Sequence, residues 1–176
     1  STWFSRNSAT IARTTAQSYS GSASLQITTS ASVNNGAGIT PNISVTAGLS
    51  YVFSAYAKAS TGTLSDCFCS IIWRNSGGAE VSRITGNFTT INTSWSRLTA
   101  SGTAPVGAVT AELFIVRNTT GAAGLVWFVD AFLFEQASSA LPYFDGTYVD
   151  PYTGYTLTYQ AWNGTANTST STTVWG

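Results

Sequence analysis

Apolar and polar residues alternate along most of this chain, in short runs that end at Gly, Asn or Ser. Alternation with a period of two is typical of a β-strand with one buried face, and no stretch sustains the 3.6-residue period of an amphipathic helix. The runs that predict strands are 24–29, 38–45, 50–59, 67–74, 80–89, 94–102, 108–118, 124–135 and 156–162. Turn residues separate them, as at Asn34-Asn-Gly36 and Asn75-Ser-Gly-Gly78. Eight or nine strands at this spacing predict an all-β sandwich of two antiparallel sheets.

The same alternation assigns side chains to the two faces of three strands. The positions expected in the core are Tyr51, Phe53, Ala55 and Ala57, then Cys67, Cys69, Ile71 and Trp73, then Val109, Ala111, Leu113 and Ile115. Between them, Tyr56, Phe68, Ile72 and Phe114 fall on the outer side and make it unusually apolar. We expect this outer face to be covered by the C-terminal segment or to bind a partner, because large exposed apolar patches mark such surfaces.

Composition narrows the classes of function. Charged residues are only 8% of the chain, and seven basic residues balance seven acidic ones. Neither nucleic acid nor a membrane surface is expected as a partner, because both are usually bound through a basic patch, and the longest apolar runs, such as 125–129, are too short to span a bilayer. The chain has no His, which excludes a Ser-His-Asp triad, and no local pair of carboxylates is arranged for glycoside hydrolysis. We therefore expect no enzyme and no required cofactor.

The two cysteines, Cys67 and Cys69, lie two residues apart on one predicted strand. Side chains at that spacing point to the same face, side by side, and a bond between them would strain the preferred disulfide geometry. Without further Cys or His they cannot complete a zinc site. We expect two buried free thiols.

Four sequence phrases, in order, carry a resemblance over about residues 3–135. They are Ser18-Tyr-Ser-Gly-Ser-Ala-Ser-Leu-Gln-Ile27, Tyr51-Val-Phe-Ser-Ala-Tyr-Ala-Lys58, Trp95-Ser-Arg-Leu98 and Val126-Trp-Phe-Val-Asp-Ala-Phe-Leu-Phe-Glu135. Together they resemble the jelly-roll carbohydrate-binding modules grouped as families 4, 9 and 22. The resemblance implies a jelly-roll sandwich, and it implies sugar binding less directly because a fold does not determine a function.

Two departures from the family pattern concern calcium. The family's opening strand is absent, so the chain is expected to be a fragment of something longer that starts just after it. The closing pair of acids is reduced to Asp130-Ala131. Members of the family often hold a structural calcium at these two places, which makes Asp130 the candidate ligand, but calcium takes six to eight oxygens and Asp130 supplies few.

Four residues are candidates for sugar contact. Tyr56, Arg74 and Glu112 fall on outer faces and provide an aromatic platform and planar polar groups, the features that orient a ligand in a pocket. An ordinary solvent-facing strand surface, or a surface beneath the C-terminal segment, is the alternative for these three. Trp73 alternates with the core positions but ends its strand next to a turn, so both core packing and ligand stacking are open for it.

The C-terminal segment combines hydroxyl-rich sequence with aromatic residues. The aromatic residues are Tyr143, Phe144, Tyr148, Tyr152, Tyr155, Tyr159 and Trp162. A disordered tail is poor in aromatics, so we expect 138–176 to be an extended arm packed on the sandwich of 1–137 or on a neighbouring subunit, with a flexible linker as the alternative for 163–173.

This segment carries a second resemblance. Its phrases Leu141-Pro-Tyr-Phe-Asp-Gly146, Trp162-Asn-Gly-Thr165 and Asn167-Thr-Ser-Thr-Ser171 resemble the segment that follows such a jelly roll in minor tail proteins of phages infecting actinobacteria. The resemblance implies an extracellular place on the virion tail, where several copies would amplify a weak single-site affinity for a host cell-surface polysaccharide.

Three functions follow from the sequence. The first is a non-catalytic phage tail module that binds a cell-surface glycan, an uncharged one rather than an acidic one because the chain is almost uncharged. The second is a structural module that docks other tail subunits or further copies of itself through its apolar outer face. The third is the binding module of a secreted bacterial glycoside hydrolase.

Overall fold

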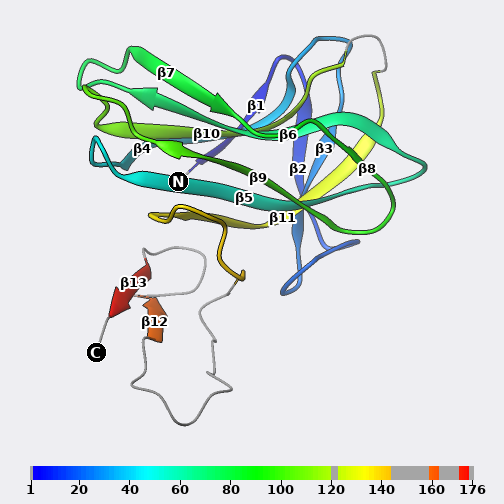
Figure 1. Ribbon diagram of the computed structural model, residues 1–176. Helices are drawn as coiled ribbons and strands as arrows, with labels where there is room; N and C mark the ends of the chain where they lie inside the picture. The colour runs from blue at the N-terminus through cyan, green and yellow to red at the C-terminus, as the bar shows by residue number, and fades with distance from the viewer. Residues whose placement is uncertain (1, 120–122, 144–158, 163–170, 175–176) are drawn as a thin grey trace. The chain divides into compact units, whose positions relative to one another are not determined.

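The computed structural model describes residues 2–119, 123–143, 159–162 and 171–174, with the backbone alone at 2, 40–42 and the last two ranges. The chain divides into two compact units, Ser1–Leu141 and Pro142–Gly176. The first is a sandwich of two antiparallel sheets, seen edge-on in Figure 1. The all-β jelly-roll prediction is confirmed. No helix occurs in the part of the chain that the structure describes, and hence none there that could cross a membrane.

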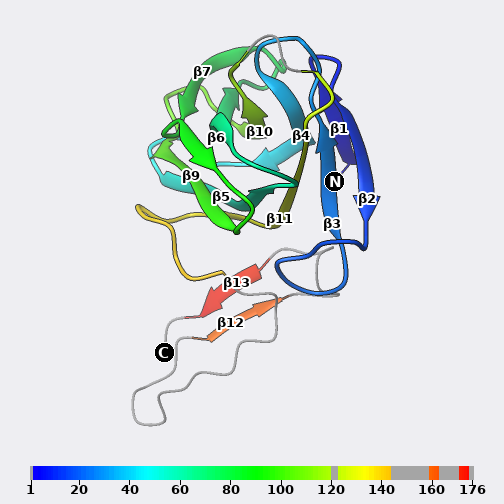
Figure 2. The same ribbon diagram turned by 90° about the vertical axis from the view of Figure 1, so that its right-hand side faces the viewer.

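Six strands form one sheet. In spatial order they are β1 (Thr2–Arg6), β4 (Asn35–Ser44), β10 (Thr110–Arg117), β6 (Leu64–Arg74) and β7 (Glu80–Thr85), and β8 (Thr89–Ile91) also pairs with β6. All these pairings are antiparallel, and Figure 2 shows the sheet from the end of the sandwich.

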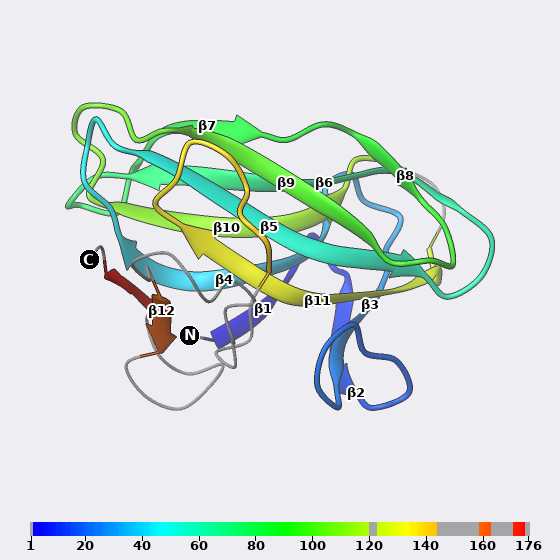
Figure 3. The ribbon, with the colours of Figure 1, turned by 60° about the horizontal axis from the view of Figure 1, so that its bottom comes forward.

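Five strands form the other sheet, whose outer side faces the viewer in Figure 3. In spatial order they are β2 (Thr10–Thr14), β3 (Ser24–Thr28), β11 (Val126–Glu135), β5 (Ser50–Ala59) and β9 (Ser96–Thr103). In the second unit, β12 (Tyr159–Trp162) and β13 (Ser171–Val174) pair antiparallel. The arm's predicted packing lies outside what the structure describes, as do Phe144, Tyr148, Tyr152 and Tyr155 and residues 163–170 of the predicted linker stretch.

The core lies between the two sheets and consists of the residues that alternation placed there. Trp73, Phe53 and Ile71 are among its largest fully buried side chains. Cys67 and Cys69 are buried free thiols, as expected, and burial raises the pKa of Cys67 to about 12. The face assignment for β5, β6 and β10 is thus confirmed, apart from Val109, which precedes β10 and is exposed.

Strand β11 departs from simple alternation. Ala131 adopts a left-handed φ of 51°, and the register with β5 shifts between Asp130 and Leu133. Such a β-bulge inserts one extra residue and reverses the face of everything after it. Trp127 precedes the bulge and Phe134 follows it. Because of the extra residue, both pack in the core although an odd number of positions separates them. Asp130 lies just before the bulge and, alternating with the buried Trp127 and Val129, points outward, toward the loop that leads into β3.

Candidate functional site

A hollow of about 150 Å³ lies on the outer face of the six-stranded sheet. Its apolar lining residues are Phe68, Ile72, Phe88, Phe114 and Val116. Its polar lining residues are Arg6, Asn34, Ser70, Arg83, Thr85 and Asn118. The side chains come mainly from β1, β6, β7 and β10, so the hollow follows directly from the order of the strands in this sheet.

The floor of the hollow is a second apolar cluster, separate from the core. Phe68, Ile72, Phe114 and Val116 are buried there, and Phe4 packs against them. The Phe4 and Phe114 rings meet edge to face with centroids 5.7 Å apart. Between these two residues in the strand register lies Gly38, which leaves room for both rings to lie over β4. The floor is therefore flat and aromatic because the strand beneath it has no side chain at that position.

Phe88 adds an exposed aromatic edge to this floor. It lies between β7 and β8 and is 55% exposed. Its ring centroid is 4.9 Å from that of Phe68, at an interplanar angle of 47°. A large exposed aromatic ring beside a buried one provides apolar area to a ligand at little cost in conformational entropy.

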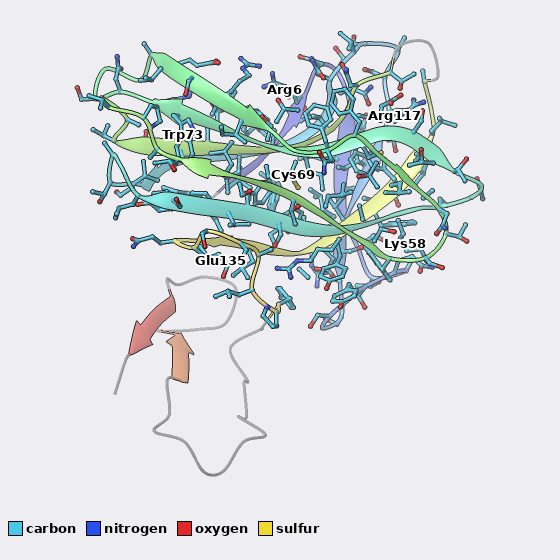
Figure 4. All side chains as sticks on the ribbon, viewed as in Figure 1. Arg6, Lys58, Cys69, Trp73, Arg117 and Glu135 are labelled. Atoms are coloured by element: carbon cyan, nitrogen blue, oxygen red, sulfur yellow. The ribbon has the colours of Figure 1, made fainter. Side chains whose placement is uncertain are left out.

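Arg6 brings a positive charge to the hollow. Its guanidinium carbon lies 4.0 Å from the centroid of the Phe114 ring, a cation–π contact. Burial, and next the nearby Arg83, lower the pKa of Arg6 below its usual value. Figure 4 shows Arg6 on the outer side of its sheet, across the sandwich from Lys58 and Glu135.

Two ion pairs flank the hollow on the same sheet face. Arg83 donates two hydrogen bonds of 2.7 Å to the two carboxylate oxygens of Glu80, and this bonding holds the pKa of Glu80 below its usual value. Arg74 pairs with Glu112, and its Nη1 also donates to the carbonyl oxygen of Gly78 at 2.9 Å. Arg74 and Glu112 thus sit beside the hollow without lining it.

The four sugar-contact candidates do not form one site. Arg74 and Glu112 lie together, but Tyr56 is on β5, in the other sheet. Trp73 is fully buried in the core, with 0% of its surface exposed, so its ring packs there and presents no face on which a ligand could stack. Because β5 belongs to the other sheet, the expectation that Tyr56 shares an outer face with Phe68 and Phe114 is wrong. Alternation shows that a side chain points away from the core, but it does not show to which sheet the strand belongs.

Tyr56 belongs to a smaller aromatic cluster on the five-stranded sheet. Its ring stacks on that of Tyr19 with centroids 3.7 Å apart, and Trp95 meets Tyr19 edge-on at 6.0 Å. Lys58 donates to the amide oxygen of Gln17 at 3.0 Å, which ties the loop before β3 to β5. The ring contacts and this hydrogen bond thus join the loop to the outer face of the five-stranded sheet.

Asp130 holds the same loop through its carboxylate. One oxygen accepts the backbone N–H groups of Tyr19 at 2.7 Å and Ser20 at 3.2 Å, and the other accepts that of Ala131 at 2.7 Å. Among the described residues, no group of three or more acidic, His or Cys side chains gathers to hold a metal ion. The surroundings of Asp130 do not fit a calcium ion, because backbone donors occupy the carboxylate that would bind it.

Sequence reasoning missed Arg6 and Phe4, because none of the runs that predicted strands covered β1. It also passed over Phe88 and Asn118, which lie outside the strands of the structure although the predicted runs 80–89 and 108–118 included them, and over Asn34 in the turn before β4. The signal for the floor was present in the outward parity of Phe68, Ile72 and Phe114.

The family described as "Carbohydrate binding domain" (families 4 and 9) matches residues 1–121. The CBM22-1 xylan-binding domain of Paenibacillus barcinonensis Xyn10C is similar with a TM-score of 0.62 at 20% identity, covering 78% of this chain and 87% of that one. The C-terminal family 22 carbohydrate-binding module of Clostridium thermocellum Xyn10B gives 0.61 at 21% identity, covering 80% and 88%.

One similar structure comes from a virus. The enzymatically active domain of bacteriophage CBA120 tailspike protein 4 gives a TM-score of 0.53 at 18% identity, covering 75% of this chain but 18% of that one. No curated protein matches the chain. At sequence identities of 18–21%, these similarities show a shared fold and no more.

Proposed function

Because the chain belongs to the carbohydrate-binding domain family, we propose that it is a non-catalytic module that binds a polysaccharide in the hollow of the six-stranded sheet. The observation that carries the proposal is the aromatic floor of Phe68, Phe88 and Phe114 with polar side chains at its edge. Pyranose rings present apolar C–H faces to aromatic side chains, and convergent polar groups then orient the hydroxyls.

The polar edge offers hydrogen-bond acceptors to a ligand. The Ser70 hydroxyl donates to the carbonyl oxygen of Ile84 at 2.9 Å, so its remaining capacity is to accept from a ligand. Asn34 has a buried amide oxygen without a hydrogen-bond partner in the described structure, and an amide oxygen accepts from a hydroxyl. Each such bond is worth about 0.5–1.5 kcal/mol net, so a few of them with the aromatic contact suit a weak, specific binder.

The test compares one substitution in each sheet. Phe88→Ala removes the exposed ring of the hollow, and Tyr56→Ala removes an aromatic ring from the opposite sheet. Titration calorimetry with xylohexaose should show about tenfold weaker binding for Phe88→Ala, a loss of about 1.4 kcal/mol, and unchanged binding for Tyr56→Ala. Since Phe88 is mostly exposed, its loss should hardly change the melting temperature. The reverse pattern would place the site on the five-stranded sheet and defeat the proposal.

The glycoside hydrolase context has the stronger support. One of the family 22 modules described above is named as a xylan-binding domain, and the protein that carries the other, Xyn10B, is named as an endo-1,4-β-D-xylanase. We propose that this chain likewise serves as the binding module of a secreted bacterial glycoside hydrolase, holding the enzyme on its polysaccharide. The sequence of the parent gene on either side is the direct test, because a catalytic domain there would be decisive.

The phage tail context is the second candidate. It is favoured by the C-terminal phrases that resemble phage minor tail proteins, and by the likeness to a tailspike domain. In that context the module would act as an adhesin for a host polysaccharide, and tail genes would flank its own. A structural docking role would show itself as tight self-association without retention on any cell wall or polysaccharide.

A further inference from the structure

The charges on the hollow's side of the six-stranded sheet do not cancel. Arg83 is neutralised by Glu80 through two hydrogen bonds, and Arg74 is neutralised by Glu112. Arg6 is the third arginine of this face, and no acid remains for it: the hollow's lining holds two arginines and no carboxylate. One positive charge is therefore left over in a protein whose net charge is zero.

The side chain of Arg6 has no hydrogen bond or ion pair to any residue that the structure describes. Its contact is with the Phe114 ring, which attracts the cation but accepts none of its five N–H groups in the guanidinium plane. The side chain is half-buried against the floor rather than extended into solvent. Burial of a charged group without a partner is unfavourable, and its effect is the lowered pKa of Arg6.

The cation–π contact with Phe114 explains where the guanidinium of Arg6 lies, but it leaves the N–H donors of that group unpaired. A methionine or lysine would cover an aromatic ring as well, with less cost for an unpaired planar donor group. The guanidinium instead presents a forked pair of donors at the edge of a hollow whose floor suits a sugar ring. A carboxylate is the group that matches this fork with two parallel hydrogen bonds.

We infer that the hollow binds an acidic polysaccharide, with the carboxylate of a uronic acid residue paired to Arg6 and its pyranose ring against Phe68 and Phe88. This inference rests on the proposed function and deepens it by naming the class of sugar. It replaces the expectation of an uncharged glycan, because a net charge of zero conceals one uncompensated cation at the site.

The experiment uses two matched pairs of ligands that differ only in charge. One pair is a xylo-oligosaccharide carrying a glucuronic acid branch and its methyl ester, and the other is oligogalacturonate and its full methyl ester. Calorimetry at low salt should show about tenfold tighter binding of the free acid in at least one pair. The preference should shrink at high salt, because the pair is partly exposed.

Substitutions then assign the preference to Arg6. Arg6→Gln should abolish the preference, measured as the ratio of acid to ester affinity within the same variant, and Arg6→Lys should keep part of it, since lysine retains the charge without the fork. Arg13→Gln, an exposed arginine on β2 of the other sheet, is the matched control and should change nothing. Arg6→Met keeps the cover over Phe114 and should behave as Arg6→Gln, which separates charge from packing.

The outcomes are distinct. Equal affinity for acid and ester in both pairs, with binding still weakened by Phe88→Ala, overturns the inference and leaves the proposed function standing. A preference that survives Arg6→Gln also overturns it, because the anion would then bind elsewhere. Binding of xylohexaose without binding of either acidic oligosaccharide would likewise overturn the inference and leave the proposed function standing. Failure to bind any glycan overturns the proposed function as well.

Discussion

Gly38 is the position where one added methyl group should disturb the hollow most. It lies in β4 directly between Phe4 of β1 and Phe114 of β10 in the strand register. An added Cβ would lie 2.4 Å from Cζ of Phe4 and 2.7 Å from Cε1 of Phe114. Carbon atoms pack at about 3.5–4.0 Å, so in Gly38→Ala each ring must move by roughly 1 Å.

Both rings can move only outward, toward the hollow, because β4 lies beneath them. Overpacking of this kind costs about 1–3 kcal/mol, and the gain from replacing a glycine in a strand returns up to about 1 kcal/mol. A net loss of about 1–2 kcal/mol should lower the melting temperature by roughly 2–8 °C for a domain of this size. The displaced rings should also weaken glycan binding by about tenfold, a loss of roughly 1.4 kcal/mol.

Calorimetric melting and glycan titration measure both effects. Gly77→Ala is the matched control, since a Cβ at this turn position meets only the Asn75 side-chain oxygen, at 3.4 Å. Phe4→Leu should make room, so Gly38→Ala should cost less in that background than in the wild type. A Gly38→Ala protein with wild-type melting temperature and affinity would refute the account of the floor.

Three other outcomes are expected. Asp130→Asn should destabilise the domain by about 1–3 kcal/mol in urea unfolding, because the N–H groups of Tyr19 and Ser20 lose a charged acceptor, and an unchanged midpoint would contradict this. Calcium and EDTA should leave the melting temperature of the wild type unchanged, and a rise with calcium would restore the calcium site. Cys67 and Cys69 should resist a thiol reagent until unfolding. Reaction of the native protein with the reagent at pH 8 would contradict the burial of the thiols. Because burial raises both thiol pKa values, the buried neutral thiols contribute stability below pH 9, and this stability is lost as the pH rises toward about 12.

The fold was predictable where one face of a strand is buried and the other is not. Strand β5 begins and ends at the predicted residues, Ser50 and Ala59, because its alternation of buried and outward positions is regular. Strands β1 and β2 were missed. β2 is an edge strand that is partly or fully exposed along its length, so burial imposes no alternation on its sequence.

The site was less predictable than the fold. The apolar outward residues Phe68, Ile72 and Phe114 were visible as an anomaly, and they are the floor of the hollow. Arg6 and Phe88 complete it from segments far apart in sequence, and nothing in the local sequence of either connects it to β10. Trp73 shows the converse case, in which a residue near a turn is nevertheless fully buried because β6 continues past it.

The sequence by itself determined the fold class, the core and the free thiols, because the two-residue alternation along a strand shows which side chains are buried and which point outward. Only the tertiary structure decided which sheet each outward side chain belongs to, since that depends on pairings between strands distant along the chain. The pairing of strands placed Tyr56 and Phe114 on different sheets. It also brought Glu80 to Arg83 and Glu112 to Arg74 as ion pairs, and left the side chain of Arg6 without an acidic partner among the described residues. Net charge is a total over the whole chain and alternation is a pattern within one strand, whereas a binding site depends on which few residues of different strands meet.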